Sequence, residues 1–80
     1  MKTLDAKGLF CPEPIMMLHQ AIREIDVGER LELLATDPAT LRDVRKFSTF
    51  LGHELEVSEE LDGDYRYVIL KCEGEDAEDE

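Results

Sequence analysis

Apolar residues recur with the spacing of an amphipathic helix in two segments of the chain. The first helix is expected over Pro12–Asp26, with Gly28 as its C-terminal stop. The second is expected to begin after Asp37, with Pro38 at its first position, and to end at Gly52. The apolar stripes of the two helices consist of Ile15, Leu18, Ile22 and Ile25, and of Leu41, Val44, Phe47 and Leu51. Each helix therefore has one face suited to packing on a sheet.

Four other segments are rich in β-forming residues and predict strands. They cover Thr3–Lys7, Arg30–Thr36, Glu54–Leu61 and Tyr65–Lys71. In the third of these strands, Leu55 and Val57 alternate with polar residues, so one face of the strand is expected to be buried. The dipeptide Asp62-Gly63 predicts a tight hairpin between the last two strands.

The element order β-α-β-α-β-β restricts the fold to few architectures. A strand-helix-strand crossover makes its two strands parallel, and a hairpin makes the last pair antiparallel. We therefore expect an α/β two-layer sandwich, in which two helices cover one face of a mixed four-stranded sheet. Because the first two strands are parallel, both helix N-termini meet the same edge of the sheet. Cys11 and Asp37 are thus expected to border one surface.

Length and charge fit one small domain followed by an acidic tail. The chain has 80 residues and a formal net charge of −11. We expect a single domain over residues 1–72. Residues 73–80 include six acidic residues and no basic one, and a disordered tail is expected there. Direct binding of nucleic acid is not expected, because phosphate contacts need clustered Lys and Arg.

Nothing in the sequence indicates a membrane or an export route. It has no apolar run of the roughly 20 residues that span a bilayer, and its first residues lack the apolar core of a signal peptide. Two cysteines make a thin disulfide framework. We therefore expect a cytoplasmic protein without membrane association and with Cys11 in the reduced state.

The segment Cys11-Pro-Glu-Pro14 is the strongest chemical signal in the sequence. With Cys11 at the N-cap of the first helix, Pro12, Glu13 and Pro14 are its first three residues. The amides of Glu13 and Ile15 then remain to face the sulfur. The positive end of the helix dipole is expected to lower the pKa of Cys11, against repulsion from Glu13. The alternative is a buried structural thiol, since cysteine is among the most buried residue types.

Six further residues are candidates for a partner-binding surface around this turn. They are Met16, Met17, Asp37, Arg42, Arg45 and Lys46. The three basic residues share one helix face and form either a solvated surface or a docking patch for an acidic protein. The two methionines either fill the core or provide a flexible apolar rim around the thiol. The aspartate is first a helix cap, and its role at the surface is secondary.

The other cysteine and the histidines add no chemistry to this reading. Cys72 ends the last strand and is expected to be an incidental thiol, and a Cys11–Cys72 disulfide depends on geometry outside the sequence. His19 lies about 12 Å from Cys11 along the helix axis, too far to act on the thiol. His53 is expected to help cap the second helix. No metal and no cofactor are expected, because these residues lack ligand spacing.

Four segments, in this order, resemble the TusA/SirA-like family of sulfur carriers, and its TusA branch most closely. They are Leu9–Met17, Ala35–Thr40, Phe50–Leu55 and Asp64–Val68. The likeness runs from Thr3 to Lys71 and leaves out only the acidic tail. Cys-Pro-x-Pro alone is a weak pattern, but it is specific in this position and with the other three segments.

The resemblance implies a sulfurtransferase that works as a relay carrier without independent turnover. Cys11 would accept sulfane sulfur from a cysteine desulfurase as a persulfide and pass it to a downstream acceptor protein. In the TusA branch the relay ends at 2-thiolation of the tRNA wobble uridine; other members serve molybdenum cofactor biosynthesis or sulfur oxidation. A carrier with one reactive edge works as a monomer and need not touch tRNA. The alternative is a regulatory or redox-sensing binding module with Cys11 as a structural cap or sensor.

One position departs from the family pattern. Several relatives carry a cysteine in the second helix where this chain has Ser48. The chain therefore lacks a second thiol there that could resolve a persulfide or form a switch disulfide.

Overall fold

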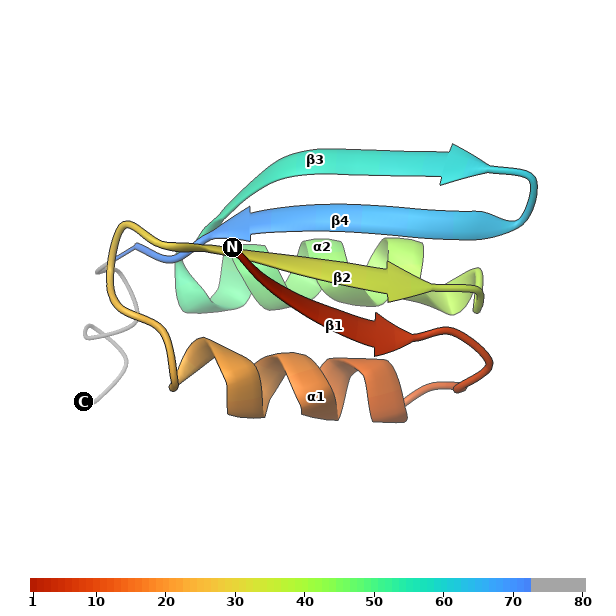
Figure 1. Cartoon of the computed structure of the whole chain (residues 1–80), viewed down its shortest axis with the longest axis horizontal. Coiled ribbons are helices and arrows are strands. Elements are labelled where there is room, and N and C mark those ends of the chain that lie inside the picture. Colours follow the sequence, from red (N-terminus) through yellow and green to blue (C-terminus); the bar gives the residue numbers. More distant parts are fainter. Residues whose placement is uncertain (73–80) are drawn as a thin grey trace.

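Four strands form one sheet in the order β1-β2-β4-β3, and both helices lie on the same face of it (Figure 1). The computed structural model describes residues 1–72, so the predicted tail, residues 73–80, lies outside the described residues. The elements are β1 (Lys2–Ala6), α1 (Glu13–Ile22), β2 (Arg30–Ala35), α2 (Ala39–Leu51), β3 (Glu54–Leu61) and β4 (Asp64–Leu70).

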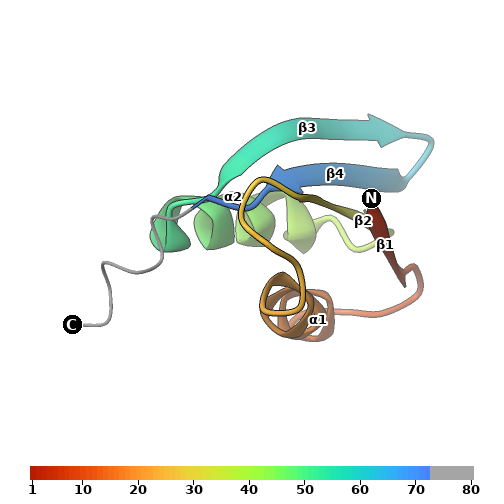
Figure 2. The same ribbon diagram turned by 60° about the vertical axis from the view of Figure 1, so that its left-hand side comes forward.

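The strand pairing confirms the topology expected from the sequence. β1 pairs parallel with β2, and β4 pairs antiparallel with both β2 and β3. The turned view in Figure 2 shows the sheet as one layer and the two helices as the other. α1 packs under β1 and β2, and α2 packs under β3 and β4. The expected α/β two-layer sandwich is therefore confirmed.

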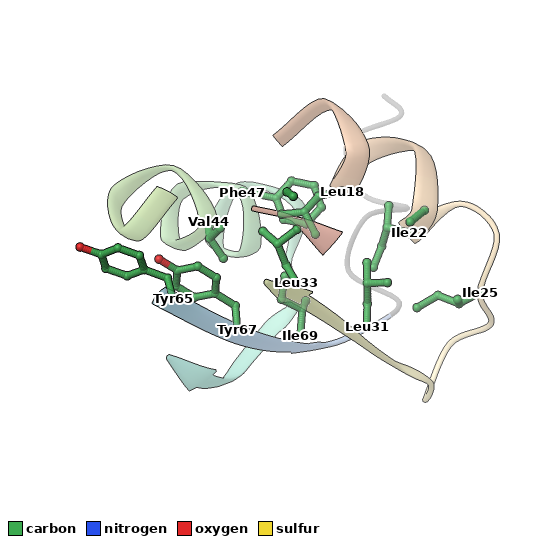
Figure 3. Packing of buried hydrophobic residues seen from close by; sticks show 12 residues of the cluster. Leu18, Ile22, Ile25, Leu31, Leu33, Val44, Phe47, Tyr65, Tyr67 and Ile69 are labelled. Atoms are coloured by element: carbon green, nitrogen blue, oxygen red, sulfur yellow. The ribbon is translucent and has the colours of Figure 1, made fainter. Parts of the chain in front are cut away.

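The core lies between the two layers (Figure 3). Its largest fully buried apolar side chains in the helices and the two central strands are Leu18, Leu31, Leu33, Val44, Tyr67 and Ile69. Burial of such side chains contributes about 1.5–3 kcal/mol each relative to exposure. The packed strands and helices thus support the loops that follow β1 and β2 at one end of the sheet.

The first helix is shorter than the apolar period predicts. It begins at Glu13, and Arg23 N–H and Glu24 N–H already donate to Gln20 O and Ala21 O, which closes the last turn. Ile25 is buried beyond the helix end. Ile25 therefore continues the helical spacing of the buried apolar residues, although it lies outside the helix. The chain then turns at Gly28, whose φ of 96° lies in the region that favours glycine.

The inward face of α2 differs by one residue from the predicted stripe. Leu41 is 42% exposed, and Thr40 is buried in its place. Thr40 Oγ1 donates to Asp37 O at 2.7 Å and pairs with the hydroxyl of Tyr67 at 2.9 Å. A threonine hydroxyl has one hydrogen, so the Tyr67 hydroxyl donates to Thr40. A satisfied polar pair therefore replaces the expected leucine.

Leu55 and Val57 are both half-buried between exposed neighbours, as the alternation predicts, but they do not share one face of the sheet. Leu55 pairs with Ile69, but Val57 pairs with Val68, because a bulge interrupts the register between them. Neighbouring residues of a strand point to opposite faces of a sheet. Leu55 consequently packs on the core while Val57 lies on the open face. The Asp62-Gly63 hairpin is confirmed, with positive φ values at both residues.

Candidate functional site

The loops that precede the two helices are tied together at one edge of the sheet. Cys11 N–H donates to Asp37 Oδ2 at 2.9 Å, and Gly8 N–H donates to Thr36 Oγ1 at 2.9 Å. Both bonds join the β1–α1 loop to the β2–α2 loop. The expected shared surface of Cys11 and Asp37 is therefore confirmed.

Asp37 fixes both Cys11 and the start of α2. While Oδ2 accepts from Cys11 N–H, Oδ1 accepts the N–H of Ala39, the first residue of the helix, at 3.0 Å. These backbone hydrogen bonds, first from Ala39 and then from Cys11, hold the pKa of Asp37 below its ordinary value. Its capping role is confirmed, although it lies one residue before the N-cap residue Pro38.

Cys11 is exposed, but it is not the N-cap of α1. The helix has Pro12 at its N-cap, and the peptide bond between Cys11 and Pro12 is cis. Glu13 N–H, which was expected to face the sulfur, donates instead to Phe10 O at 2.9 Å. Cys11 thus lies in a turn that precedes the helix, and its backbone is held from the side by Asp37.

The thiol of Cys11 has a carboxylate rather than a helix end as its neighbour. Its Sγ donates to Asp43 Oδ2 at 3.2 Å. This hydrogen bond, followed by desolvation and by the negative charges of Asp43 and Asp37, raises the pKa of Cys11. Arg42 acts in the opposite direction. The predicted lowering of the Cys11 pKa is therefore wrong for this structure, because Asp43 favours the neutral thiol.

A mostly apolar groove begins at Cys11 and runs between the two helices. It is lined by Cys11, Pro12, Ile15, His19, Asp43, Lys46, Phe47, Phe50 and Leu51. His19 and Phe47 meet edge to face with ring centroids 4.9 Å apart, which joins α1 to α2 along the groove. Phe50 is 82% exposed, an unusual environment for a large aromatic side chain. The groove gives a partner an apolar surface next to the thiol.

The candidate surface residues divide into two groups. Lys46 lines the groove, and Arg42 contacts Asp43 Oδ1 through Nε at 3.4 Å. Arg45 is exposed on the same helix. The methionines lie elsewhere: Met16 is exposed, Met17 packs partly on the core, and both line a separate hollow along α1. Lys46 and Arg42, and not the methionines, therefore accompany Cys11.

Cys72 lies at the opposite end of the sheet from Cys11. It follows β4, which runs antiparallel to β2, whereas Cys11 follows β1, which runs parallel to β2 (Figure 1). Lys71 O accepts from Gly28 N–H at 2.9 Å in the loop beyond the far end of α1. Both cysteines are free thiols, and this placement excludes a bridge between them.

His53 makes hydrogen bonds at the end of α2 and with Cys72, and it does not line the groove beside Cys11. Its backbone N–H donates to Ser48 O at 2.9 Å, so the expected contribution to the end of α2 is confirmed. Its Nδ1 also accepts the N–H of Cys72 at 3.0 Å, a link that the sequence did not suggest. Within residues 1–72, His, Cys, Asp and Glu side chains form no group of three or more that could hold a metal ion.

Phe50 and Asp43 belong to the site but were not predicted from the sequence, and only Phe50 could have been recognised from its pattern. Phe50 falls outside the apolar stripe of its helix, and a large aromatic residue on the polar face of an amphipathic helix suggests a binding surface. Asp43 could not be recognised, because its contact with Cys11 depends on how the two helices pack. His19 was expected to lie too far from Cys11 along the axis of α1 to act on the thiol. It nevertheless lines the same groove as Cys11.

The fold and the site together define a small α/β sandwich with one exposed thiol at the edge where its two helices begin. The same fold occurs in the crystal structure of a SirA-like protein from Desulfitobacterium hafniense. That structure matches with a TM-score of 0.80 and 26% sequence identity, over 91% of this chain and all of the other. In the part of the chain that the structure describes, no helix is long and apolar enough to cross a membrane.

Sequence comparisons identify the family of the chain. The family model for sulfurtransferase TusA matches residues 2–71. Proteins named sulfur carrier protein TusA are similar to the chain, among them that of Pseudomonas syringae, 54% identical over 85% of this chain and 81% of its own length. That of Pseudomonas entomophila is 56% identical over 86% of each chain. The chain belongs to the TusA family.

Proposed function

We propose that this protein is a sulfur carrier whose Cys11 takes up sulfane sulfur from a cysteine desulfurase as a persulfide. The carrier then passes this sulfur to a downstream acceptor protein, and the relay ends in 2-thiolation of the tRNA wobble uridine. The observation that supports this most directly is the exposed Cys11 thiol, whose backbone is held by Asp37.

The chemistry of such a relay is thiol–persulfide exchange. Cys11 loses its proton, and its sulfur attacks the outer sulfur of the donor persulfide. The bond between the two donor sulfurs breaks as the new bond to Cys11 Sγ forms. The donor cysteine leaves as a thiolate and takes up a proton. No external oxidant or reductant is needed. Delivery uses the same exchange, in which an acceptor thiolate attacks the outer sulfur of the Cys11 persulfide.

The surroundings of Cys11 suit this exchange better than a hydrolytic or disulfide reaction. Its sulfur is exposed, so that a second protein can reach it. Cys72 is at the far end of the sheet, which leaves no resolving thiol close to a Cys11 persulfide within residues 1–72. The persulfide would therefore persist until an acceptor thiol arrives.

The groove beside Cys11 supports docking of the donor on the face formed by α1 and α2. Phe50 offers an exposed aromatic anchor, a residue type that carries much of the energy of protein interfaces. Lys46 and Arg42 add positive charge on the same side of the thiol. Membership of the family and this surface together support a protein, rather than tRNA, as the direct partner.

The proposed pathway is tested in cells that lack their own TusA-type carrier. The 2-thiouridine content of tRNA is measured after expression of the wild-type chain, Cys11→Ser or Cys72→Ser. We expect the wild type and Cys72→Ser to restore thiolation and Cys11→Ser to fail at equal protein levels. Restoration by Cys11→Ser would refute a persulfide on this residue. Failure of the wild type in an assay where a known carrier succeeds would favour another acceptor, such as one in molybdenum cofactor biosynthesis or sulfur oxidation.

A further inference from the structure

We propose that Asp43 is a proton-holding residue of the site: its carboxylate keeps the sulfur on Cys11 protonated, which protects the free carrier. This inference builds on the proposed function and assigns a role to a residue outside the Cys-Pro-Glu-Pro turn. It rests on the contact between Asp43 Oδ2 and Cys11 Sγ, 3.2 Å apart.

The position of Asp43 is fixed on both of its oxygens. Oδ2 accepts from the thiol, while Oδ1 lies 3.4 Å from Arg42 Nε. Asp43 is only half-buried, but α2 carries it, and the buried neighbours Val44 and Phe47 anchor that stretch of helix on the core. The carboxylate is thus carried by a helix that packs on the core, while Asp37 holds the backbone N–H of Cys11.

The charged and titratable side chains near the Cys11 thiol come from α1, from α2 and from the loop before α2. α2 supplies Asp43, Arg42 and Lys46, the loop before it supplies Asp37, and α1 supplies His19. Glu13 of α1 lines a separate hollow with Met16 and Met17. Asp43 is the group that accepts a hydrogen bond from the thiol directly. The raised pKa of Cys11 has this hydrogen bond as its first cause, which agrees with the geometry.

A protonated sulfur has consequences in both states of the carrier. In the empty carrier the neutral thiol reacts slowly with oxidants and alkylating agents, because the thiolate is the nucleophile. In the loaded carrier a carboxylate at the same place favours the neutral persulfide. The outer sulfur of a neutral persulfide lacks the negative charge that would repel an attacking acceptor thiolate. Asp43 therefore slows stray reactions and favours delivery.

The test measures how fast iodoacetamide alkylates Cys11 between about pH 6 and pH 10, where thiols titrate. The product is quantified on the Cys11 peptide by mass, so Cys72 does not contribute. In Asp43→Asn we expect the rate near neutral pH to rise about fivefold, the effect of removing one charge in contact across water. In Arg42→Gln the rate should fall, because the opposing positive charge is lost. Asp43→Glu, which keeps the charge, should remain close to the wild type.

The matched control is Asp26→Asn, which removes the same charge beyond the far end of α1. That helix has ten residues, a length of about 15 Å. The inference is overturned if Asp43→Asn leaves the rate profile unchanged, or if Asp26→Asn changes it equally. Should Asp43→Asn fail to fold in a thermal melt, Asp43→Ser takes its place, since it removes the same carboxylate: faster alkylation supports the inference, and an unchanged rate overturns it.

The alkylation experiment uses the empty protein, so its result is independent of sulfur transfer. Loading by a cysteine desulfurase, followed by intact mass, tests the proposed function separately. A wild type that loads while Asp43→Asn shows no change in alkylation refutes the role of Asp43 alone. A wild type that never loads refutes the proposed function, whatever the alkylation shows.

Discussion

Replacing Ser48 with alanine is predicted to stabilise the protein. Ser48 lies on the inner side of α2 and is 3% exposed. Among the buried side-chain oxygen and nitrogen atoms of residues 1–72, its Oγ is the one without a hydrogen-bond partner. Removal of that hydroxyl therefore abolishes a desolvation cost and breaks no hydrogen bond.

The size of the gain follows from two terms. A buried polar group without a partner costs about 1–3 kcal/mol, and alanine exceeds serine in helix propensity by about 0.5 kcal/mol. The small cavity left by one oxygen atom offsets part of this sum. We expect a net gain of about 1 kcal/mol in the free energy of unfolding, which raises the Tm of a domain this small by about 4–8 °C.

The assay is urea and thermal unfolding of the wild type, Ser48→Ala and the control Thr49→Ala. Thr49 is the next residue of α2 and is exposed, so its replacement reports helix propensity without a buried hydroxyl. A Ser48→Ala variant no more stable than Thr49→Ala would refute a desolvation cost at the Ser48 hydroxyl. A cysteine at position 48 would be equally buried, and so poorly placed to attack an exposed persulfide.

Three further predictions concern the core, the cap and the groove. Tyr67→Phe should lower the free energy of unfolding by about 1 kcal/mol, measured in urea, because the hydrogen bond to Thr40 is lost. Asp37→Asn should destabilise the fold at neutral pH. Because folding lowers the pKa of Asp37, its contribution is complete above its unfolded pKa of about 3.9 and is lost as the pH falls through the lower folded value, so acid titration should show the two proteins converging there. Phe50→Ala should leave unfolding within about 0.5 kcal/mol of the wild type but weaken binding to the desulfurase in calorimetry, whereas Leu61→Ala, exposed at the end of β3, should bind normally.

The sequence was sufficient to predict the architecture because its signals were local and consistent. Two apolar stripes of helical period, two proline-initiated helices and the Asp62-Gly63 turn determined the order of elements. The parallel pairing of the first two strands then brought Cys11 beside Asp37. Errors arose where tertiary structure modified the pattern, as with the bulge before Val57 and the polar pair that buries Thr40.

The electrostatics of the site could not be predicted in the same way. An N-terminal helix dipole is a local feature, and it suggested a lowered pKa for Cys11. The deciding neighbour, Asp43, lies 32 residues away in the sequence and reaches the sulfur only through the packing of α2 beside α1. The exposure of Phe50 also depends on packing, although its place outside the apolar stripe was visible.

Cys11 is the residue proposed to carry sulfur, and one measurement tests this directly. Purified wild-type protein and Cys11→Ser are incubated side by side with a cysteine desulfurase and free cysteine, and intact masses are compared before and after reduction. We predict that the wild type alone gains one sulfur atom and loses it on reduction. A gain of equal size on Cys11→Ser, or none on the wild type while the desulfurase loads another carrier, would contradict the account.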